Sequence, residues 1–266
     1  MRRLLTAPLL ALLFVSPGGA SPPQAGPLLI LGGGVVPAGA RGRCLELAGV
    51  EEARVVILPQ ASGRDGRGTG SVAPWTKAGA GAVVLLDPLD ESSLAEIARA
   101  DVIWLPGGSQ SRLMRELREA KLVEAIRKRH AAGAVVAGSS AGAAVMSRAM
   151  ITGDAELEAV RAGATEIAEG LGLWPGVIVD QHFVARRRNN RLLAAVLDRP
   201  QLVGVGIDED TGVVVGPKRF EVIGRGTVVV YDAREATVEE HEPGQRHGAI
   251  GLRVHVLRAG MSLARP

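Results

Sequence analysis

The chain has little cysteine and almost no excess of charge, and each of these shortages excludes a class of protein. Cys44 is the only cysteine among 266 residues. An intramolecular disulfide and a thiolate metal cluster are therefore excluded, and the fold depends on its packed core. Lys and Arg total 31 against 28 Asp and Glu, a formal net charge of +3. This balance gives no electrostatic basis for binding nucleic acid.

Long hydrophobic runs and low-complexity segments are also scarce. The chain is 47% hydrophobic and 22% charged, which is a globular balance and excludes intrinsic disorder. Glycine is abundant, at 35 residues, but it has no three-residue period, so a collagen-like fold is excluded. We expect one domain over residues 27–266, because no linker divides this part of the chain.

Residues 1–20 have the organisation of an export signal. Arg2 and Arg3 precede an apolar run from Leu4 to Val15, and small residues lead to Ala20, where we expect cleavage. A membrane anchor is the alternative, but this run is shorter than the roughly 20 apolar residues that span a bilayer. The prediction is an exported protein, periplasmic or extracellular, with residues 21–26 as a short leader. The paired arginines leave the export route open.

From residue 27 onward, short apolar runs that end in small residues alternate with helical stretches. Continuous apolar strands are typical of a sheet whose two faces are both covered. The prediction is an α/β fold of three layers, with a mostly parallel central sheet and helices on both faces. The expected strands are Leu28–Leu31, Arg54–Leu58, Ala82–Leu86, Asp101–Leu105, Ala134–Ala137 and Gly176–Val179, with helices at Ser92–Ala100 and Ser111–Ala132.

After Leu202 the pattern changes to closely spaced strands separated by turn residues. This spacing predicts antiparallel hairpins attached to the sheet. The expected strands are Val203–Asp208, Gly212–Val215, Glu221–Ile223, Thr227–Tyr231 and a segment within Gly248–Leu257.

The strongest local motif is Gly138-Ser139-Ser140-Ala141-Gly142, which follows an apolar strand. A GxSxG sequence between a strand and a helix is typical of a nucleophile elbow, in which the turn lifts a serine hydroxyl above the sheet. Ser140 is therefore the candidate nucleophile. The structural alternative is a small-residue turn that packs a helix closely against a strand.

A serine nucleophile requires a general base, and His182 is the best-placed of five histidines. It follows the apolar run Val177–Val179 and so lies at the edge of a sheet where catalytic groups collect. His130 lies near a helix end among charges, where a solvated side chain is the simpler interpretation. The remaining histidines are His241, His247 and His255, in the tail.

The base in turn requires a carboxylate that orients it. Glu209 ends the run Val205–Asp208, and we favour it over Glu158 because strand ends are held more rigidly than loops. Asp208 and Asp210 flank Glu209 and remain alternatives.

An oxyanion needs backbone donors close to the nucleophile. The amide of Ala141 is one candidate, and the turn Pro106–Gln110 supplies Gly108 as the second.

The segment Asp180–Phe183, followed by Arg186, Arg188 and Arg191, resembles the DQHFxxRxRxxRL motif of cyanophycinases, serine peptidases related to aspartyl dipeptidase. The resemblance extends over most of residues 27–262 through three further motifs and the tail. It implies a class I glutamine amidotransferase-like fold and a Ser140, His182, Glu209 triad. The substrate contacts that it implies are Gln110, Asp180, Gln181, Arg186, Arg188 and Arg191. The chain departs from the family pattern at Gly32–Val35, which lacks an acidic residue, and at Gly63–Gly70, which is shortened.

Helical geometry constrains the three arginines independently of the resemblance. Residues two apart on a helix do not share a face, so Arg186 and Arg188 cannot both face the site from one helix. Either only one of them reaches the site, or both precede a helix that begins near Asn189 or Asn190 and buries Leu192 and Val196; the second alternative is the one we favour.

The sequence thus predicts an exported serine exopeptidase that hydrolyses multi-L-arginyl-poly-L-aspartate to β-Asp-Arg dipeptides through an acyl-enzyme. We expect no metal or organic cofactor, no nucleic acid partner and no membrane association after signal cleavage, and a homodimer stays open. The alternatives are an α-aspartyl dipeptidase with the same triad and an exported, non-catalytic binding protein on the same fold. An amidotransferase would need cysteine at position 140. An α/β-hydrolase esterase would place its acid before its histidine.

Overall fold

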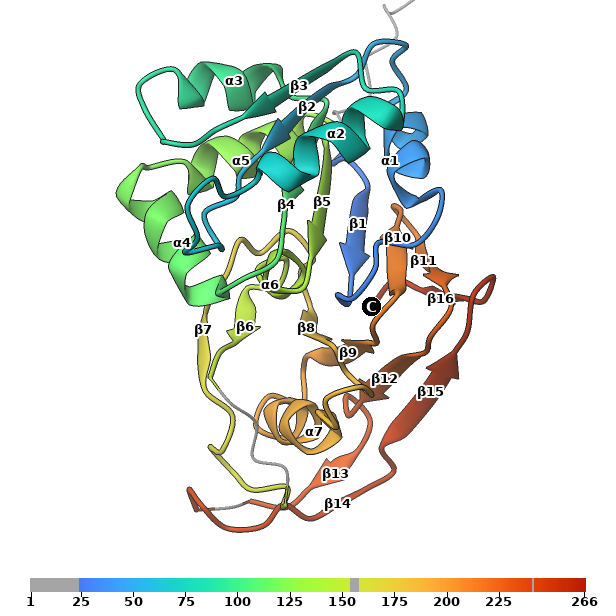
Figure 1. The fold of residues 1–266 in the computed structure, drawn as a ribbon. Helices are drawn as coiled ribbons and strands as arrows, with labels where there is room; N and C mark the ends of the chain where they lie inside the picture. Colours follow the sequence, from blue (N-terminus) through green and yellow to red (C-terminus); the bar gives the residue numbers. More distant parts are fainter. Residues whose placement is uncertain (1–23, 154–157, 241) are drawn as a thin grey trace, which may run out of the picture.

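One large sheet organises the molecule, which is described here by a computed structural model covering residues 24–153, 158–240 and 242–266 (Figure 1). The predicted export signal lies outside these residues. Eight strands follow the order β16-β11-β10-β1-β5-β4-β2-β3. The part from β1 to β3 is parallel. Its strands are β1 (Leu28–Leu31), β5 (Val135–Ser139), β4 (Val102–Leu105), β2 (Arg54–Ile57) and β3 (Ala82–Leu85).

The remaining strands of this sheet are antiparallel and join it at β1. They are β10 (Thr211–Val215), β11 (Arg219–Gly224) and β16 (Ser262–Ala264). The predicted attachment of late hairpins to the parallel sheet is therefore confirmed for β10 and β11, whereas β16 was not predicted.

A second sheet, of order β15-β12-β9-β8, holds four segments that were predicted within the main sheet or as hairpins attached to it: Gly176–Val179, Val203–Asp208, Thr227–Tyr231 and the strand within Gly248–Leu257. The Gly176–Val179 run was expected in the main sheet, but β8 (Val177–Gln181) pairs in parallel with β9 (Val203–Ile207) outside it. An apolar run predicts that both faces of a strand are covered, but it does not specify which sheet the strand joins. The other strands are β12 (Val228–Asp232) and β15 (Arg253–Leu257), and two-stranded sheets form from β6 (Ala149–Ile151) with β7 (Ile167–Glu169) and from β13 (Thr237–Val238) with β14 (Ala249–Ile250).

Helices cover both faces of the main sheet, as predicted. On one face, α1 (Ala40–Ala48) and α2 (Thr69–Lys77) enclose a core that contains Cys44 and Trp75. On the other face lie α3 (Ser93–Arg99), α4 (Gln110–Glu119), α5 (Val123–Ala131) and α6 (Ala141–Ala144). The second sheet packs against α7 (Asn189–Leu197), which buries Leu192 and Val196. No helix within the described residues is long and apolar enough to cross a membrane.

The helix predicted over Ser111–Ala132 is two helices, α4 and α5. Lys121 adopts a left-handed backbone with φ 58°, which ends the first helix and redirects the chain. Leu117 and Leu122 on either side of this turn are both buried. Apolar periodicity continues across the break, and the sequence has no glycine there to mark it.

The elbow helix α6 packs against the sheet at a distance that only glycine permits. A Cβ on Gly142 would lie 1.9 Å from the carbonyl oxygen of Leu105. Close helix–strand packing, the structural alternative for the GxSxG motif, is therefore a real feature of this turn and coexists with its half-buried serine.

We predict that Gly142→Ala lowers the free energy of unfolding by at least about 2 kcal/mol, because the backbone of β4 cannot yield to the added methyl group. Gly70→Ala is the matched control. Gly70 lies in α2 with no atom within 4 Å of an added Cβ, so this change should stabilise the protein by about 0.5–1 kcal/mol. Urea unfolding of the two variants measures both effects, and an equal stability would contradict the packing argument.

Candidate active site

Three loops converge at the carboxyl end of β1. Consecutive carbonyl oxygens of Leu31, Gly32 and Gly33 accept hydrogen bonds from the backbone amides of Ser140 (3.0 Å), His182 (2.7 Å) and Asp210 (2.9 Å). These amides belong to the loops after β5, β8 and β9. The end of one strand therefore fixes all three segments that carry the predicted triad.

Ser140 has the strained backbone of a nucleophile elbow. Its φ is 54° and its ψ is −110°, between β5 and the first residue of α6. Such angles are unfavourable for a residue with a Cβ and occur where the surroundings impose them, often at functional sites. The residue is only half-buried, so its hydroxyl is accessible at the edge of the sheet.

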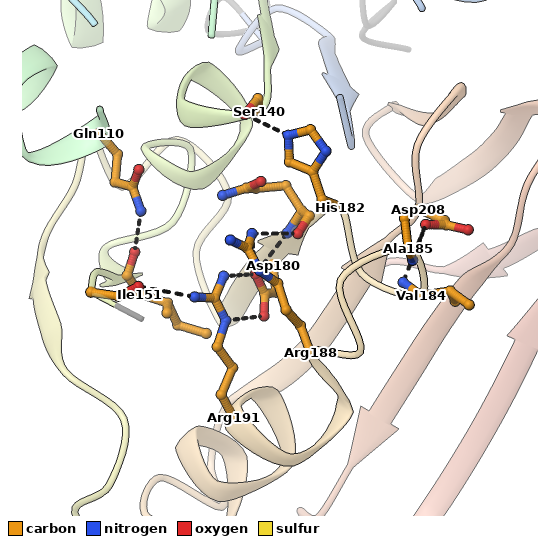
Figure 2. A network of polar contacts seen from close by, with 12 residues as sticks. Gln110, Ser140, Ile151, Asp180, His182, Val184, Ala185, Arg188, Arg191 and Asp208 are labelled. Carbon is orange, nitrogen blue, oxygen red and sulfur yellow. Dashed lines mark hydrogen bonds and ion pairs between the residues drawn. The ribbon is translucent and has the colours of Figure 1, made fainter. Parts of the chain in front are cut away.

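His182 joins the serine to a carboxylate. Its Nε2 lies 2.9 Å from Ser140 Oγ, and its Nδ1 lies 2.5 Å from Glu209 Oε1 (Figure 2 shows the first of these contacts). Because the ionised Glu209 can only accept, Nδ1 carries the proton and Nε2 accepts from the hydroxyl. This arrangement allows the imidazole to remove the serine proton while Glu209 stabilises the resulting positive charge.

The alternative carboxylates have other partners. Asp208 accepts hydrogen bonds from the amides of Val184 and Ala185, and Asp210 accepts from the amide of Val35 and from Arg225. Glu209 alone, of the three adjacent acids, contacts the His182 ring. Glu158 lies in the segment that follows β6, and the position against Nδ1 is held by Glu209.

Gly33 closes the site behind the imidazole. Its φ is 113°, and a Cβ at this position would lie 2.3 Å from Cε1 of His182. The ring is thus packed directly on backbone, which limits its rotation. No role at the site was predicted for Gly33; the run of three glycines after the first strand is the sequence signal that points to it.

The environment lowers the pKa of His182 below its usual value. Burial is the largest cause, and the nearby charges of Arg186 and Arg188 act in the same direction. The hydrogen bond and the negative charge of Glu209 oppose this effect by raising the pKa. The neutral imidazole, which is the form that accepts a proton, therefore persists at lower pH than in an ordinary histidine.

The two predicted oxyanion donors flank Ser140. Ala141 is the first residue of α6, and the first amides of a helix have no acceptor within it. On the other side, a Cβ on Gly107 would lie 3.2 Å from Ser140 Cβ and 3.7 Å from its Oγ, so the Gly107–Gly108 turn lies close to the nucleophile. Gly108 has φ 147°, and a Cβ on it would lie 2.2 Å from the carbonyl oxygen of Ala61, which excludes a side chain. Two backbone segments thus border the position of a reacting oxygen.

Asp180 and Arg191, predicted as substrate contacts, bind each other instead. Two hydrogen bonds join the guanidinium to the carboxylate, one of them 2.8 Å from Nε to Oδ2 (Figure 2). Their side chains are 1% and 2% exposed. In this conformation a substrate cannot reach Arg191, because α7 begins at Asn189 and places residue 191 on its buried face.

The other predicted contacts lie around this ion pair. Arg188 donates to the carbonyl of Gln181 (2.7 Å) and lies 3.8 Å from Asp180. Gln110 donates to the carbonyl of Ile151 (3.1 Å). The buried Oε1 of Gln181 has no hydrogen-bond partner among the described residues. Arg186 is exposed and, as predicted, precedes the helix together with Arg188. The substrate-binding roles of these residues stay predictions.

Comparisons with known proteins agree on one family. Residues 28–223 match the family described as Peptidase family S51. The chain is 37% identical over 229 residues to a cyanophycinase of Geminocystis herdmanii (strain PCC 6308), covering 80% of this chain and 83% of the relative. It is 38% identical over 228 residues to a cyanophycinase of Trichormus variabilis (strain ATCC 29413 / PCC 7937), covering 80% and 76%.

Solved structures share the fold at lower sequence identity. A peptidase from an acI-B1 Actinobacterium superposes with a TM-score of 0.64 at 23% identity, over 91% of this chain and 98% of the other. A putative Peptidase E protein from Listeria monocytogenes EGD-e gives a TM-score of 0.52 at 21% identity, over 76% and 100%. These likenesses support the predicted α/β architecture.

The charge of Arg186 should be visible in the pH dependence of the nucleophile. We predict that Arg186→Gln raises the pKa of His182, because it removes a positive charge that disfavours the imidazolium. The acidic limb of the pH profile for labelling of Ser140 by a fluorophosphonate should then move to higher pH. Arg187→Gln, a change of the same charge at an exposed neighbour, should leave the profile in place. Identical profiles for the wild type and Arg186→Gln would contradict this assignment.

Proposed function

The chain belongs to peptidase family S51 and is a serine-type peptidase, and we propose that it degrades a cyanophycin-like polymer, multi-L-arginyl-poly-L-aspartate, to β-Asp-Arg dipeptides. The observation that carries the proposal is the continuous contact from Ser140 through His182 to Glu209, held on the end of β1. The two cyanobacterial relatives described above bear the name cyanophycinase, which supports this substrate class.

The proposed reaction proceeds through an acyl-enzyme. Ser140 Oγ attacks the backbone carbonyl carbon while His182 Nε2 takes the hydroxyl proton, and the amides of Gly108 and Ala141 stabilise the oxyanion. Collapse of the tetrahedral intermediate breaks the C–N bond, and the leaving amine takes the proton from Nε2. A water molecule then attacks the ester, gives a proton to Nε2, and displaces Ser140 with that proton restored to Oγ.

The charges around the site suit an acidic substrate. Asp180 is neutralised by Arg191 in the interior, whereas Arg186 is exposed near His182. No carboxylate lies within ion-pair distance of Arg186 in the described part of the chain. In the proposed polymer, each arginine attached to an aspartate side chain keeps a free carboxylate. Such a carboxylate is a suitable partner for the charge of Arg186.

We predict that Ser140→Ala lowers hydrolysis of the arginine-bearing polymer by at least about 10³-fold, because the residual activity of such sites comes only from binding and the oxyanion donors. Release of β-Asp-Arg, followed by chromatography, is the measurement. Ser139→Ala changes the same side chain one residue earlier and should retain both turnover and fluorophosphonate labelling. Full activity of Ser140→Ala would refute the mechanism.

The same assay separates the rival functions. An α-aspartyl dipeptidase would cleave Asp-Xaa dipeptides in preference to the polymer. A non-catalytic binding protein would hold the polymer without turnover and without labelling by fluorophosphonate.

Export of the protein is part of the proposal and rests on the basic and apolar pattern of residues 1–20. Expression of the full chain in a bacterial host should place it outside the cytoplasm, with a mature amino terminus close to residue 21. Mass spectrometry of fractionated cells provides the measurement, with deletion of residues 2–20 as the control. An uncleaved protein that stays in the cytoplasm would contradict the proposal.

A further inference from the structure

A recess opens beside the nucleophile, at the ends of the strands β4 and β2. Its volume is about 440 Å³, and it lies between the loop Ala61–Arg64 after β2 and the turn Gly107–Ser109 after β4. The two loops are joined by a hydrogen bond from the amide of Ser109 to the carbonyl of Ala61 (2.8 Å). Because β2 and β4 are parallel neighbours, both loops lie at the sheet edge that carries Ser140.

The Gly107–Gly108 turn separates this recess from the catalytic centre and adjoins both. Gly107 and Gly108 both line the recess, Gly107 lies close to Ser140, and Gly108 is the proposed oxyanion donor. In Figure 2, Gln110 at the start of α4 lies on one side of Ser140 and His182 lies on the other. A peptide extending past Ser140 away from His182 would therefore enter this recess.

Two cations of the recess have no carboxylate partner among the described residues. Arg112 uses one guanidinium nitrogen to donate to the carbonyl of Ala61 (3.3 Å), and Arg64 is exposed. The nearby Arg67 shows the contrast, because it is bound by both Asp87 and Glu116. Asp87 and Glu116 thus neutralise Arg67, whereas Arg112 and Arg64 keep their charges available to the recess.

We propose that Arg112, assisted by Arg64, binds a substrate carboxylate in a subsite next to the oxyanion turn. This inference rests on the proposed peptidase function and extends it to the specificity of the site. The free nitrogens of Arg112 form a planar donor pair that matches a carboxylate. The bond to Ala61 orients the guanidinium before the ligand arrives, which reduces the side-chain entropy lost on binding.

The subsite explains how an acidic chain is aligned at the nucleophile. Arg186 near His182 and Arg112 beyond Gly108 place positive charges on both sides of Ser140. A substrate with carboxylates at regular intervals would contact both, which fixes the position of the carbonyl between them. A neutral peptide would lack both contacts and would bind without this alignment.

The test uses two short oligomers of the arginine-bearing aspartate chain, one with free arginine carboxylates and one in which every arginine is amidated. Dissociation constants are measured calorimetrically with Ser140→Ala, which binds without turnover. Adding Arg112→Gln should weaken binding of the carboxylate oligomer about tenfold, as expected for a partly exposed charge-assisted contact. The same change should leave binding of the amidated oligomer unaltered. In the active enzyme, Arg112→Gln should raise KM with little change in kcat.

Arg115→Gln is the matched control, because Arg115 lies on the same helix, is exposed and faces Glu119 rather than the recess. Arg115→Gln should leave the dissociation constants of both oligomers unchanged. Arg112→Lys should restore part of the affinity that Arg112→Gln loses for the carboxylate oligomer. Equal weakening of both oligomers by Arg112→Gln, or no weakening of either, would overturn the subsite. Tight carboxylate-dependent binding by a wild-type enzyme that cleaves neither oligomer would instead refute the proposed function and leave the subsite standing.

Discussion

The active site depends on the backbone of three residues at the end of β1. Leu31, Gly32 and Gly33 offer consecutive carbonyl oxygens, and each accepts an amide from a different loop of the predicted triad. Leu31 ends β1, and the chain bends at Gly33, whose φ is 113°, so the three carbonyl oxygens serve three separate loops. Their side chains then meet within hydrogen-bond distance. Precise alignment of the hydroxyl, imidazole and carboxylate is therefore a property of main-chain hydrogen bonds, which do not depend on side-chain rotamers.

These bonds also hold the loops in conformations that they would not adopt alone. Ser140, His182 and Asp210 have φ values of 54°, 50° and 55°, in the region that disfavours residues with a Cβ. Each such residue costs about 1–3 kcal/mol. The amides of these three residues all bind the end of β1, and those hydrogen bonds help to offset the conformational cost at the site. Gly33 and Gly34 serve the same end, because a side chain on either would collide with His182 or Asp210.

Much of this arrangement could be predicted from the sequence, because the residues with catalytic side chains directly follow recognisable apolar strands. Strand ends followed by glycine, histidine or acid identified the loops that converge, and the structure brings Ser140, His182 and Glu209 into contact. The second sheet was not predicted, because the burial of Val177–Val179 does not reveal its pairing partner. The break at Lys121 was not predicted either, since a left-handed lysine follows from tertiary packing rather than from propensity. Gly33 was missed because it acts only by lacking a side chain, which would collide with the His182 ring.

The recognition side of the site is built differently from the catalytic side. Asp180 and Arg191 form a buried ion pair beneath Gln181 and Arg188, and Arg188 in turn binds the carbonyl of Gln181. Removing one partner of a buried pair leaves an uncompensated charge and costs about 3–5 kcal/mol. Loss of activity after replacement of Asp180 or Arg191 would thus reflect the collapse of this support, and not a lost contact with substrate. Arg186 is exposed, so its replacement reports on binding and on the His182 charge directly. The motif of closely spaced arginines therefore combines two physical roles, internal support at position 191 and an open charge at position 186, which spacing in the sequence does not distinguish.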